Sequence, residues 1–560
     1  MILRLFMAIG LSVCCIHLPA QLFSWVAPVI GGGVGKAVAV DAEGNVYSCG
    51  NANGQVDFDP GPDEALSPAN SGSNGDIYVV KYDNDGNYLW HYLAGGSNTD
   101  IAKNVVVDGN GDVLMCGYFS GSFDWDPGPD VVQPPLNTNY DSFVLKISSE
   151  GEFLWVQRMV GDGEEQAYGL AVDADNNAYL CGYYSDDVTF GDGAATLPFQ
   201  GGTLDGYYAK YSASGSLLWA KTIAGTGFQR ANSVACSGDR LYLYGACTGT
   251  TTANGTHTLT LPNTPGVAYL CKTDTAGNVL WLKSHSATDN MGGDVVRTNG
   301  TDLYVFSSFR GTVDADPGAD ILELLPTEPT DQHTLFAKLD TSGNALWAHY
   351  LQGNVHFDLV GDLALDAEGA VVVTCAVGEM QDYDTGPGEA IYTPVQPNDL
   401  YTARYAADGG FRWVRMITTG ETFDTASGAA VDLDGNVYMT GTFGDSAVFD
   451  PGPGGTFYTD NSTTAFTVKY GVDPNTGLPE EITSLALQIM PNPTRELLTI
   501  MGAFERGDAL VVLDAAGREV MSLMAQDHLM QLSVQHLVPG VYSLVWSSNR
   551  GRVSERFVVM

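Results

Sequence analysis

One short acidic motif is the clearest candidate for chemistry in this sequence of 560 residues. Two aspartates separated by one residue come before a turn at four places, namely Asp57/Asp59, Asp124/Asp126, Asp314/Asp316 and Asp382/Asp384. Carboxylates this close, together with turn carbonyls, can contribute to a Ca²⁺ site, because this ion takes six to eight oxygen ligands. The same pattern is typical of an aspartate-capped Pro-Gly turn without any metal. The sequence favours the turn and leaves calcium as the alternative.

Other chemical groupings are weak. The nine histidines are scattered, with no His-x-x-x-His pair and no Ser-His-Asp grouping, and no Cys-x-x-Cys pair predicts zinc. The 66 acidic residues leave open a carboxylate pair for glycoside or lyase chemistry. We therefore assign no catalytic, cofactor-binding or metal-binding residue from the sequence, with calcium at the aspartate motifs kept as the one cofactor alternative.

The aspartate motifs lie in a chain that repeats itself. Seven of its nine tryptophans recur at spacings of 65, 65, 64, 62, 66 and 66 residues, and they are Trp25, Trp90, Trp155, Trp219, Trp281, Trp347 and Trp413. A fixed period of this length, built from short strands, indicates a solenoid, an array or a propeller. We expect these tryptophans to dock neighbouring repeat units onto one another, because burying a large aromatic side chain is strongly favourable.

One repeat predicts four short strands, at residues 37–41, 46–50, 76–82 and 88–93, separated by turns rich in Gly, Asn and Asp. Seven such units predict an all-β fold, a seven-bladed β-propeller, with the first strand of each unit innermost. The last unit has no Trp strand of its own, while an isolated one stands at residues 22–30. We therefore predict that this N-terminal strand closes the last blade.

The repeats resemble the bacterial SBBP-type β-propeller repeats over residues 22–470. The pattern that carries the resemblance is Lys-x-Asp-x-x-Gly-x-x-x-Trp followed by Asp-x-x-Gly-Asn, and repeats 1, 2, 3 and 7 match it best. The resemblance implies a secreted or surface propeller, and it brings no agreed catalytic residues.

Both ends of the chain differ from the repeats. Residues 1–20 have the basic start and apolar run of a secretory signal peptide, although Cys14 leaves a lipoprotein as the alternative. The propeller is predicted at residues 21–470. Residues 471–484 are expected to be a linker, and short alternating strands over residues 485–560 predict a small Ig-like β-sandwich.

The C-terminal domain closely resembles the type A C-terminal sorting domain of the type IX secretion system. Its landmarks occur in the family's order and comprise Pro491, Asn492 and Pro493, then Asp514, Gly517 and Arg518, and then Pro539, Gly540 and Tyr542. The resemblance implies the type IX secretion machinery as a partner, a Bacteroidetes-like source, and a protein that is released or attached at the outer cell surface.

The charge of the chain limits its partners. The formal net charge of −41 argues against nucleic acid and anionic membranes, because 25 basic residues cannot neutralise their phosphates. No apolar segment after residue 20 approaches the length of a membrane span.

The long connections between strands all emerge on one face of the predicted propeller. We expect an unidentified glycan or protein ligand to bind on that face or near the central channel. We predict a non-catalytic binding or adhesion protein, with a polysaccharide-acting hydrolase or lyase and a structural surface component as the alternatives.

Overall fold

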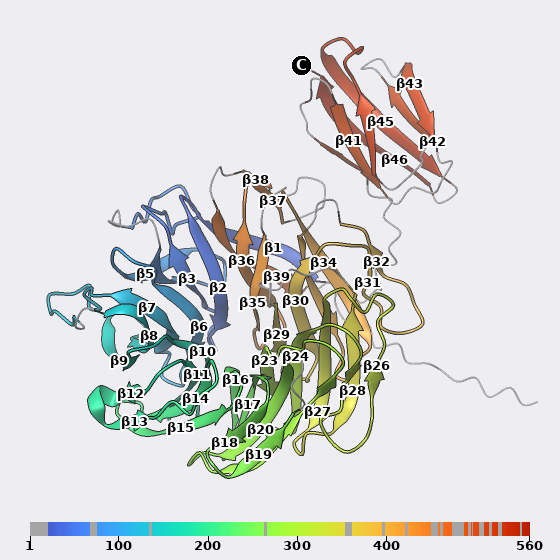
Figure 1. Ribbon diagram of the computed structural model, residues 1–560. Helices are drawn as coiled ribbons and strands as arrows, with labels where there is room; N and C mark the ends of the chain where they lie inside the picture. Colours follow the sequence, from blue (N-terminus) through green and yellow to red (C-terminus); the bar gives the residue numbers. More distant parts are fainter. Residues whose placement is uncertain are drawn as a thin grey trace, which may run out of the picture. The chain divides into compact units, whose positions relative to one another are not determined.

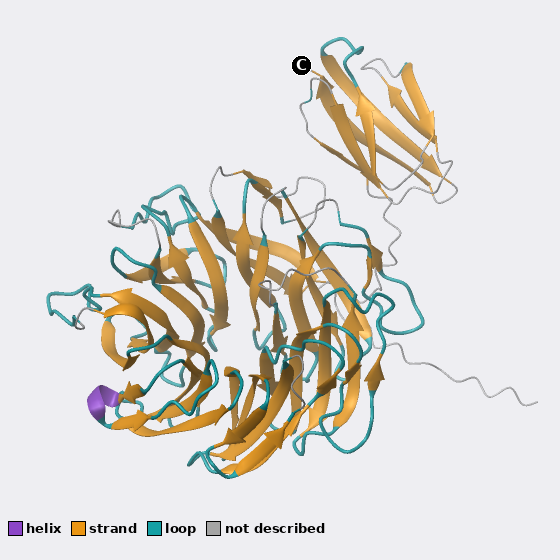
Figure 2. Cartoon of the chain, in the orientation of Figure 1, coloured by secondary structure: helices purple, strands orange, loops and turns teal. Residues whose placement is uncertain are grey.

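The computed structural model describes residues 21–67, 75–133, 137–261, 266–352, 361–394, 398–420, 424–449, 457–459, 463–472, 487–490, 494, 497–502, 509–513, 518–524, 529–548 and 551–559. The predicted signal peptide, most of the predicted linker and five sorting-motif residues, Pro491, Asn492, Pro493, Asp514 and Gly517, lie outside these residues. Within them the structure is built from strands, and its one helix is a three-residue 3₁₀ turn, Gly191–Gly193 (Figure 2).

Seven sheets in the described residues share a core of four antiparallel strands. The first has β2 (Gly33–Val40), β3 (Val46–Ala52), β4 (Asp76–Tyr82) and β5 (Tyr88–Ala94). The second has β6 (Ile101–Val107), β7 (Val113–Gly121), β8 (Asn137–Ile147) and β9 (Phe153–Gly161). The third has β10 (Glu165–Val172), β11 (Ala178–Tyr184), β14 (Asp205–Tyr211) and β15 (Leu217–Gly225). The fourth has β16 (Gln229–Ser237), β17 (Arg240–Cys247), β20 (Val267–Asp274) and β21 (Val279–Ser284).

The remaining three sheets follow the same plan. The fifth has β23 (Val295–Thr298), β24 (Asp302–Phe309), β27 (His333–Asp340) and β28 (Ala345–Leu351). The sixth has β29 (Asp362–Leu365), β30 (Val371–Val377), β33 (Asp399–Tyr405) and β34 (Phe411–Thr419). The seventh has β35 (Thr425–Val431), β36 (Val437–Phe443), β39 (Thr464–Val472) and β1 (Gln21–Val29).

Short strands in the long connections add to these sheets. Hairpin β12 (Val188–Phe190) and β13 (Ala195–Leu197) extends the second sheet, hairpin β18 (Thr250–Ala253) and β19 (His257–Thr260) the third, and hairpin β37 (Ser446–Val448) and β38 (Phe457–Thr459) the sixth. Separate small sheets are formed by β22 (Ser286–Ala287), β25 (Val313–Asp314) and β26 (Glu323–Leu324), and by β31 (Gln381–Asp382) and β32 (Ile391–Tyr392).

The sheets form a closed ring, so the predicted all-β propeller is confirmed. The first strands of successive sheets, β2, β6, β10, β16, β23, β29 and β35, are in contact in that order, and β35 returns to β2 (Figure 1). The closing strand is also as predicted, since β1 pairs antiparallel with β39, from Gln21 opposite Val472 to Val29 opposite Ala465. The hydrophobic core therefore lies between neighbouring sheets, and each cluster of buried side chains joins two or more of them.

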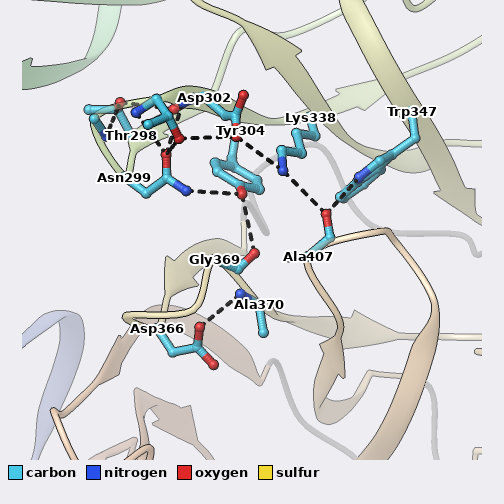
Figure 3. A network of polar contacts seen from close by, with 12 residues as sticks. Thr298, Asn299, Asp302, Tyr304, Lys338, Trp347, Asp366, Gly369, Ala370 and Ala407 are labelled. Atoms are coloured by element: carbon cyan, nitrogen blue, oxygen red, sulfur yellow. Dashed lines mark hydrogen bonds and ion pairs between the residues drawn. The ribbon is translucent and has the colours of Figure 1, made fainter.

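The repeated tryptophans lie on the fourth strand, and the six other than Trp413 contact the hairpin turn of the next sheet, Trp281 through Gly343. Nε1 of Trp90 donates a hydrogen bond to the carbonyl of Ser149 at 3.0 Å, and Nε1 of Trp347 donates to Ala407 at 3.1 Å. Figure 3 shows the second of these contacts, where Lys338 donates to the same carbonyl at 3.4 Å. Equivalent bonds run from Trp25 to Asn84, from Trp155 to Ala213 and from Trp219 to Thr275.

A glycine in the next sheet lies against each of these indoles. A Cβ atom on Gly215 would lie 2.7 Å from the Trp155 ring, and the backbone there has a φ of +84°. Glycine meets both requirements, because it tolerates positive φ and has no side chain to collide with the indole. The repeated Gly-x-x-x-Trp spacing thus has a structural cause, since each glycine receives the tryptophan of the preceding repeat.

The C-terminal residues form a second compact unit, from Asp473 to Met560, distinct from the unit that contains Gln21–Phe449. Its three-stranded sheet has β40 (Leu487–Met490), β41 (Leu497–Gly502) and β44 (Leu529–Ser533). Its four-stranded sheet has β43 (Glu519–Met524), β42 (Ala509–Leu513), β45 (Gly540–Ser548) and β46 (Gly551–Val559). Side chains of both sheets share one core that includes Ile500, Leu544 and Trp546, which makes the unit a small β-sandwich.

Ring closure by β1 can be tested by deletion. Removing residues 22–30 exposes the edge of β39 and takes Val26, Ala27 and Val29 out of the core, where each is at most 8% exposed. We expect the first thermal transition of the full chain to fall by 10 °C or more, roughly the effect of losing several buried apolar side chains. Calorimetry of the chain with and without these nine residues measures this, and an unchanged transition would contradict closure.

Docking of glycine on tryptophan can be tested by a matched pair of substitutions. Gly215→Ala adds a methyl group against Trp155 at a positive φ, whereas Gly54→Ala adds one at a similar φ of +77° with nothing within 4 Å. The backbone strain, about 1–2 kcal/mol, is common to both. We expect Gly215→Ala to lose a further ~1–3 kcal/mol through overpacking, measured by urea unfolding. Equal losses in the two variants would show that the indole contact does not matter.

Candidate functional site

The Asp-x-Asp segments form the same hydrogen-bonded turn in all four repeats. Oδ1 of Asp57 accepts hydrogen bonds from the backbone N–H of Asp59 at 3.0 Å and of Ala65 at 2.8 Å, and Oδ1 of Asp59 accepts one from Gly61 at 2.7 Å. The other three segments repeat all three bonds at distances of 2.6–3.2 Å. Each aspartate thus satisfies backbone donors that the loop would otherwise leave unpaired.

In repeats 1 and 5 the turn also pairs with the segment that follows the outer strand of the preceding sheet. The residue between the two aspartates is fully buried in every case, and these residues are Phe58, Trp125, Ala315 and Tyr383. Asp57 bridges to Ile30, directly after β1, and Asp314 pairs with Ser286, shortly after β21. Repeats 3, 4 and 7 instead place hairpins β12–β13, β18–β19 and β37–β38 on the preceding sheet. The segments therefore act as latches that cover an outer sheet edge.

Metal binding at the turns has no structural support in the described residues. No three Asp, Glu, His or Cys side chains come together there in an arrangement that could hold a metal ion. A weaker form of the motif in repeat 7, which keeps only Asp450, lies outside the described residues. Calcium at these turns stays an untested alternative.

A cavity of about 940 Å³ lies on the propeller axis, lined by the innermost strands of all seven sheets. Its charge is opposite to that of the chain as a whole. Five lining residues are basic and two are acidic, whereas the chain has 25 basic and 66 acidic residues. The basic residues are Lys36, Lys103, Arg230, Arg297 and Arg310, and the acidic ones are Asp294 and Asp362. A concave site with convergent polar groups is the default location for a ligand.

Seven equivalent positions, one per sheet, form a ring around this cavity. We define the bulge ring as Lys36, Lys103, Tyr168, Asn232, Asp294, Asp362 and Ser427, all of which line the cavity. In five sheets the register between the first two strands shifts at this residue, as at Lys36 between Gly35 and Ala37. Such a β-bulge inserts one residue and re-aims its side chain. Asp294 comes directly before β23, and Asp362 is the first residue of β29.

The bulge ring differs chemically from repeat to repeat, although its surroundings do not. The residue before each ring position is always Gly or Ala. At Gly35 a Cβ atom would lie 2.6 Å from the carbonyl of Gly441 in the neighbouring sheet, so the packing explains the small residue. The ring residue itself has no such constraint, and it is where individual side chains project toward the axis.

Three buried carboxyl groups near the starts of inner strands have raised pKa values. Burial, reinforced by a neighbouring aspartate, raises the pKa of Asp100 to about 7, of Glu165 to about 9 and of Asp424 to about 7. The neighbours, Asp76, Asp141 and Asp399, lie in the third strand of the preceding sheet. All three carboxyl groups are fully buried and lie outside the cavity lining, so a substrate cannot reach them there.

The sorting-domain landmarks that the structure describes lie at turns and in the core. Arg518 is exposed directly before β43, and Pro539 is exposed directly before β45, whose first residue is Gly540. Tyr542 is 5% exposed, stacks on Phe557 at 5.6 Å between ring centroids, and donates a hydrogen bond to the carbonyl of Val538 at 2.7 Å. Tyr542 thus ties the turn at residues 538–540 to the last strand of the sandwich.

The family described as the secretion system C-terminal sorting domain matches residues 488–560. The predicted type IX sorting domain is therefore confirmed, and the protein is exported by that system to the cell surface or the medium. In the described residues, no helix is long and apolar enough to cross a membrane. The family match does not extend to the propeller, so the resemblance to SBBP repeats stays a prediction.

Two curated proteins show distant sequence similarity to this chain. The chain is 22% identical over 488 residues to the uncharacterized WD repeat-containing protein L264 of Acanthamoeba polyphaga mimivirus, covering 78% of this chain and 31% of that protein. It is 25% identical over 175 residues to the regulatory protein FlaEY of Caulobacter vibrioides, covering 31% and 18%. The chain thus spans less than a third of the length of these curated relatives.

Among solved structures, PorZ, a surface component of the type-IX secretion system of Porphyromonas gingivalis, aligns over 96% of this chain and all of its own. The sequence identity is 11% and the TM-score is 0.18, so we base no argument on this likeness.

Sequence reasoning missed the cavity residues. It expected a ligand on the long-loop face or near the channel, but it named no residue there. The sequence did contain one signal. Near the start of each inner strand, the position that follows a Gly or Ala differs between repeats, for example Lys36, Tyr168 and Asp294, while the residues around it stay similar. The chemical role of that position follows only from the closed ring.

The raised pKa of Glu165 predicts how stability depends on pH. Because the folded state holds the proton up to about pH 9 and the unfolded state loses it near pH 4.5, the free energy of unfolding falls as pH rises between these values. The slope is at most about 1.4 kcal/mol per pH unit for one group. We expect Glu165→Gln to raise the melting temperature at pH 8 and to flatten this dependence.

The control for this substitution is Glu164→Gln, which removes the same charge from an exposed neighbour. Melting curves of both variants and the parent between pH 5 and pH 9 measure the effect. Parallel curves for all three proteins would show that the Glu165 carboxyl group does not carry the dependence.

Proposed function

We propose that the propeller is a non-catalytic binding module that acts at the cell surface or in the medium and holds its ligand in the axial cavity. The observation that carries this proposal is the bulge ring, in which seven equivalent positions place seven side chains of five kinds against one cavity. The tryptophans and glycines that join the sheets keep the same type from repeat to repeat, whereas the bulge ring varies and lines an open volume, which is the arrangement a ligand site needs. The sorting domain places this module where extracellular glycans and surface proteins are available.

The two carboxylates that line the cavity are already engaged. Asp362 accepts a hydrogen bond from the Arg297 guanidinium at 2.8 Å, and Asp294 accepts bonds from the N–H and hydroxyl of Ser308 at 2.7 and 3.0 Å. These contacts hold both carboxyl groups in fixed positions, which supports a binding role, while burial raises the pKa of each and keeps the hydrolase or lyase alternative open to the test below.

A binding screen of the full chain tests the proposal. Polysaccharides and surface proteins are offered with calcium and then with a chelator, and the products are analysed by chromatography. We expect saturable binding without product release, and we expect no effect of the chelator, because the turn aspartates already accept backbone hydrogen bonds. Product release would support the hydrolase or lyase alternative instead, and no binding at all would support a structural surface component.

A pair of variants locates the site. Ser427→Trp places an indole in the cavity, and Ser214→Trp places one in an exposed turn away from it. We expect the first variant to lose at least tenfold in affinity by calorimetry and the second to bind like the parent. Equal affinities would show that the ligand binds elsewhere.

A further inference from the structure

The junctions between neighbouring sheets share one backbone hydrogen bond. The N–H of Asp100 donates to the carbonyl of Gly75 at 3.2 Å, and the N–H of Met291 donates to that of Gly266 at 2.7 Å. Two further junctions repeat this bond. Its donor lies three residues before a bulge-ring residue, at the start of the inner strand, and we call this place the seam position. In the described residues the seam positions are Gly33, Asp100, Glu165, Gln229, Met291 and Asp424.

The residue at each seam position matches the residue that faces it. The facing residue follows the acceptor carbonyl, or its equivalent, in the third strand of the preceding sheet. Met291 faces the apolar Val267, and Gly33 faces Thr464. At the other four described junctions an aspartate faces an acid or an amide, and these pairs are Asp76–Asp100, Asp141–Glu165, Asp205–Gln229 and Asp399–Asp424.

The one amide among these four junctions shows what the position requires. Gln229 cannot ionise, and its Nε2 donates to the carbonyl of Thr248 at 3.1 Å. The Asp205 carboxylate that faces it accepts hydrogen bonds from the N–H groups of Gln200 and Gly225, so no second charge opposes it. A neutral side chain thus occupies one of four equivalent places, and a protonated carboxyl group is the neutral counterpart at the other three.

The acids at the three remaining junctions are buried without the donors that an ionised carboxylate needs. Asp100, Glu165 and Asp424 are each 0% exposed. No N–H or O–H group of the described residues donates to either oxygen of Glu165, and Oδ2 of Asp424 likewise accepts no hydrogen bond there. The charged groups that act on these acids are acidic themselves, namely Asp76 on Asp100, Asp141 and Asp186 on Glu165, and Asp399 and Asp445 on Asp424. Two buried carboxyl groups in such a place are stable together only when they hold a proton between them.

We propose that three of the seven junctions are held by a shared proton and form a pH-sensitive device, which is tight in acid and loose in alkali. The protonated member of each pair donates its O–H to the other, as the hydrogen-bonding distance between Asp141 and Glu165 allows. Loss of the proton leaves two negative charges side by side in a buried junction, where they repel strongly. The device operates whether or not the cavity binds a ligand.

The device acts on strands that line the cavity. Asp100, Glu165 and Asp424 lie on or directly before β6, β10 and β35, three residues before a member of the bulge ring. A loosened junction frees this end of the inner strand together with the ring residue that it carries. The fourth sheet lacks the device on both sides, because its junctions with the third and fifth sheets have Gln229 and Met291 at the seam position.

Hydrogen exchange of the full chain, followed by mass spectrometry at pH 5 and pH 9, tests the proposal. The rates are corrected for the intrinsic exchange rate at each pH. Each raised pKa belongs to the closed junction, whereas an opened junction has carboxyl groups of ordinary pKa. Opening therefore becomes easier as pH rises from about 4 to the raised value, about 7 for Asp100 and Asp424 and about 9 for Glu165.

We expect the strands at the three junctions to lose protection from exchange as pH rises. Protection should fall at least about tenfold in β6 and β35 and at least about a hundredfold in β10, because each pH unit below the raised pKa is worth up to tenfold. Strands β16 and β17 of the fourth sheet should keep their protection. This comparison is made within the parent protein and needs no variant.

A triple variant assigns the effect to the seam acids. It replaces each acid by its amide, as Asp100→Asn, Glu165→Gln and Asp424→Asn. We expect the pH effect in β6, β10 and β35 to disappear. A matched control removes two aspartates and one glutamate from exposed positions, as Asp63→Asn, Glu164→Gln and Asp320→Asn, and it should keep the pH effect of the parent.

Three results would overturn the inference. Equal loss of protection in β16, β17 and the three junction strands would show that the whole ring responds to its charge. Unchanged protection in β6, β10 and β35 would show that no shared proton holds these junctions. A pH effect that persists in the folded triple variant would assign it to other groups. None of these results bears on the proposed binding function, which the ligand screen tests separately.

Discussion

The structure depends on the contact between one sheet and the next. Each sheet is too small to bury its own apolar faces, and the core clusters lie between sheets rather than within them. An arrangement of this kind is stable only when no face remains open, which requires a ring. The antiparallel pairing of β1 with β39 supplies that closure from the two ends of the propeller sequence. The axial cavity exists because the ring of sheets is closed.

Closure also explains why the same residue types recur. Trp155 needs a carbonyl and a residue without a side chain in the neighbouring sheet, and Ala213 and Gly215 provide them. The latch turns act on the other side of the contact, where Phe58 or Trp125 is buried and the two aspartates satisfy the backbone around it. The repeated residues are thus the ones that join sheets. The bulge-ring residues differ between repeats, and they line the axial cavity instead.

Much of this architecture was predictable from local patterns. Strands such as Asp76–Tyr82 are short runs of β-branched and aromatic residues, and the turns around Gly44 and Gly86 have the positive-φ glycines that hairpins require. The aspartate motif forms the turn that its residues predict, but its role as a latch depends on contacts with the preceding sheet, such as Asp57 with Ile30, which no local pattern contains. The paired carboxyl groups Asp141 and Glu165 were invisible for the same reason, because they approach each other only across a sheet boundary.

The sequence by itself determined the repeat, the all-β propeller, the closing strand and the sorting domain, because runs of β-branched and aromatic residues, turn residues and short landmarks are written in consecutive residues. Only the tertiary structure shows which residues come together in the candidate site. Lys36, Lys103 and Tyr168 stand about one repeat apart in the chain, and each is a single polar residue among ordinary neighbours. They become one wall only because seven inner strands converge on an axis and a bulge in most of them turns one side chain inward. A site assembled from one residue per repeat leaves no local pattern to recognise.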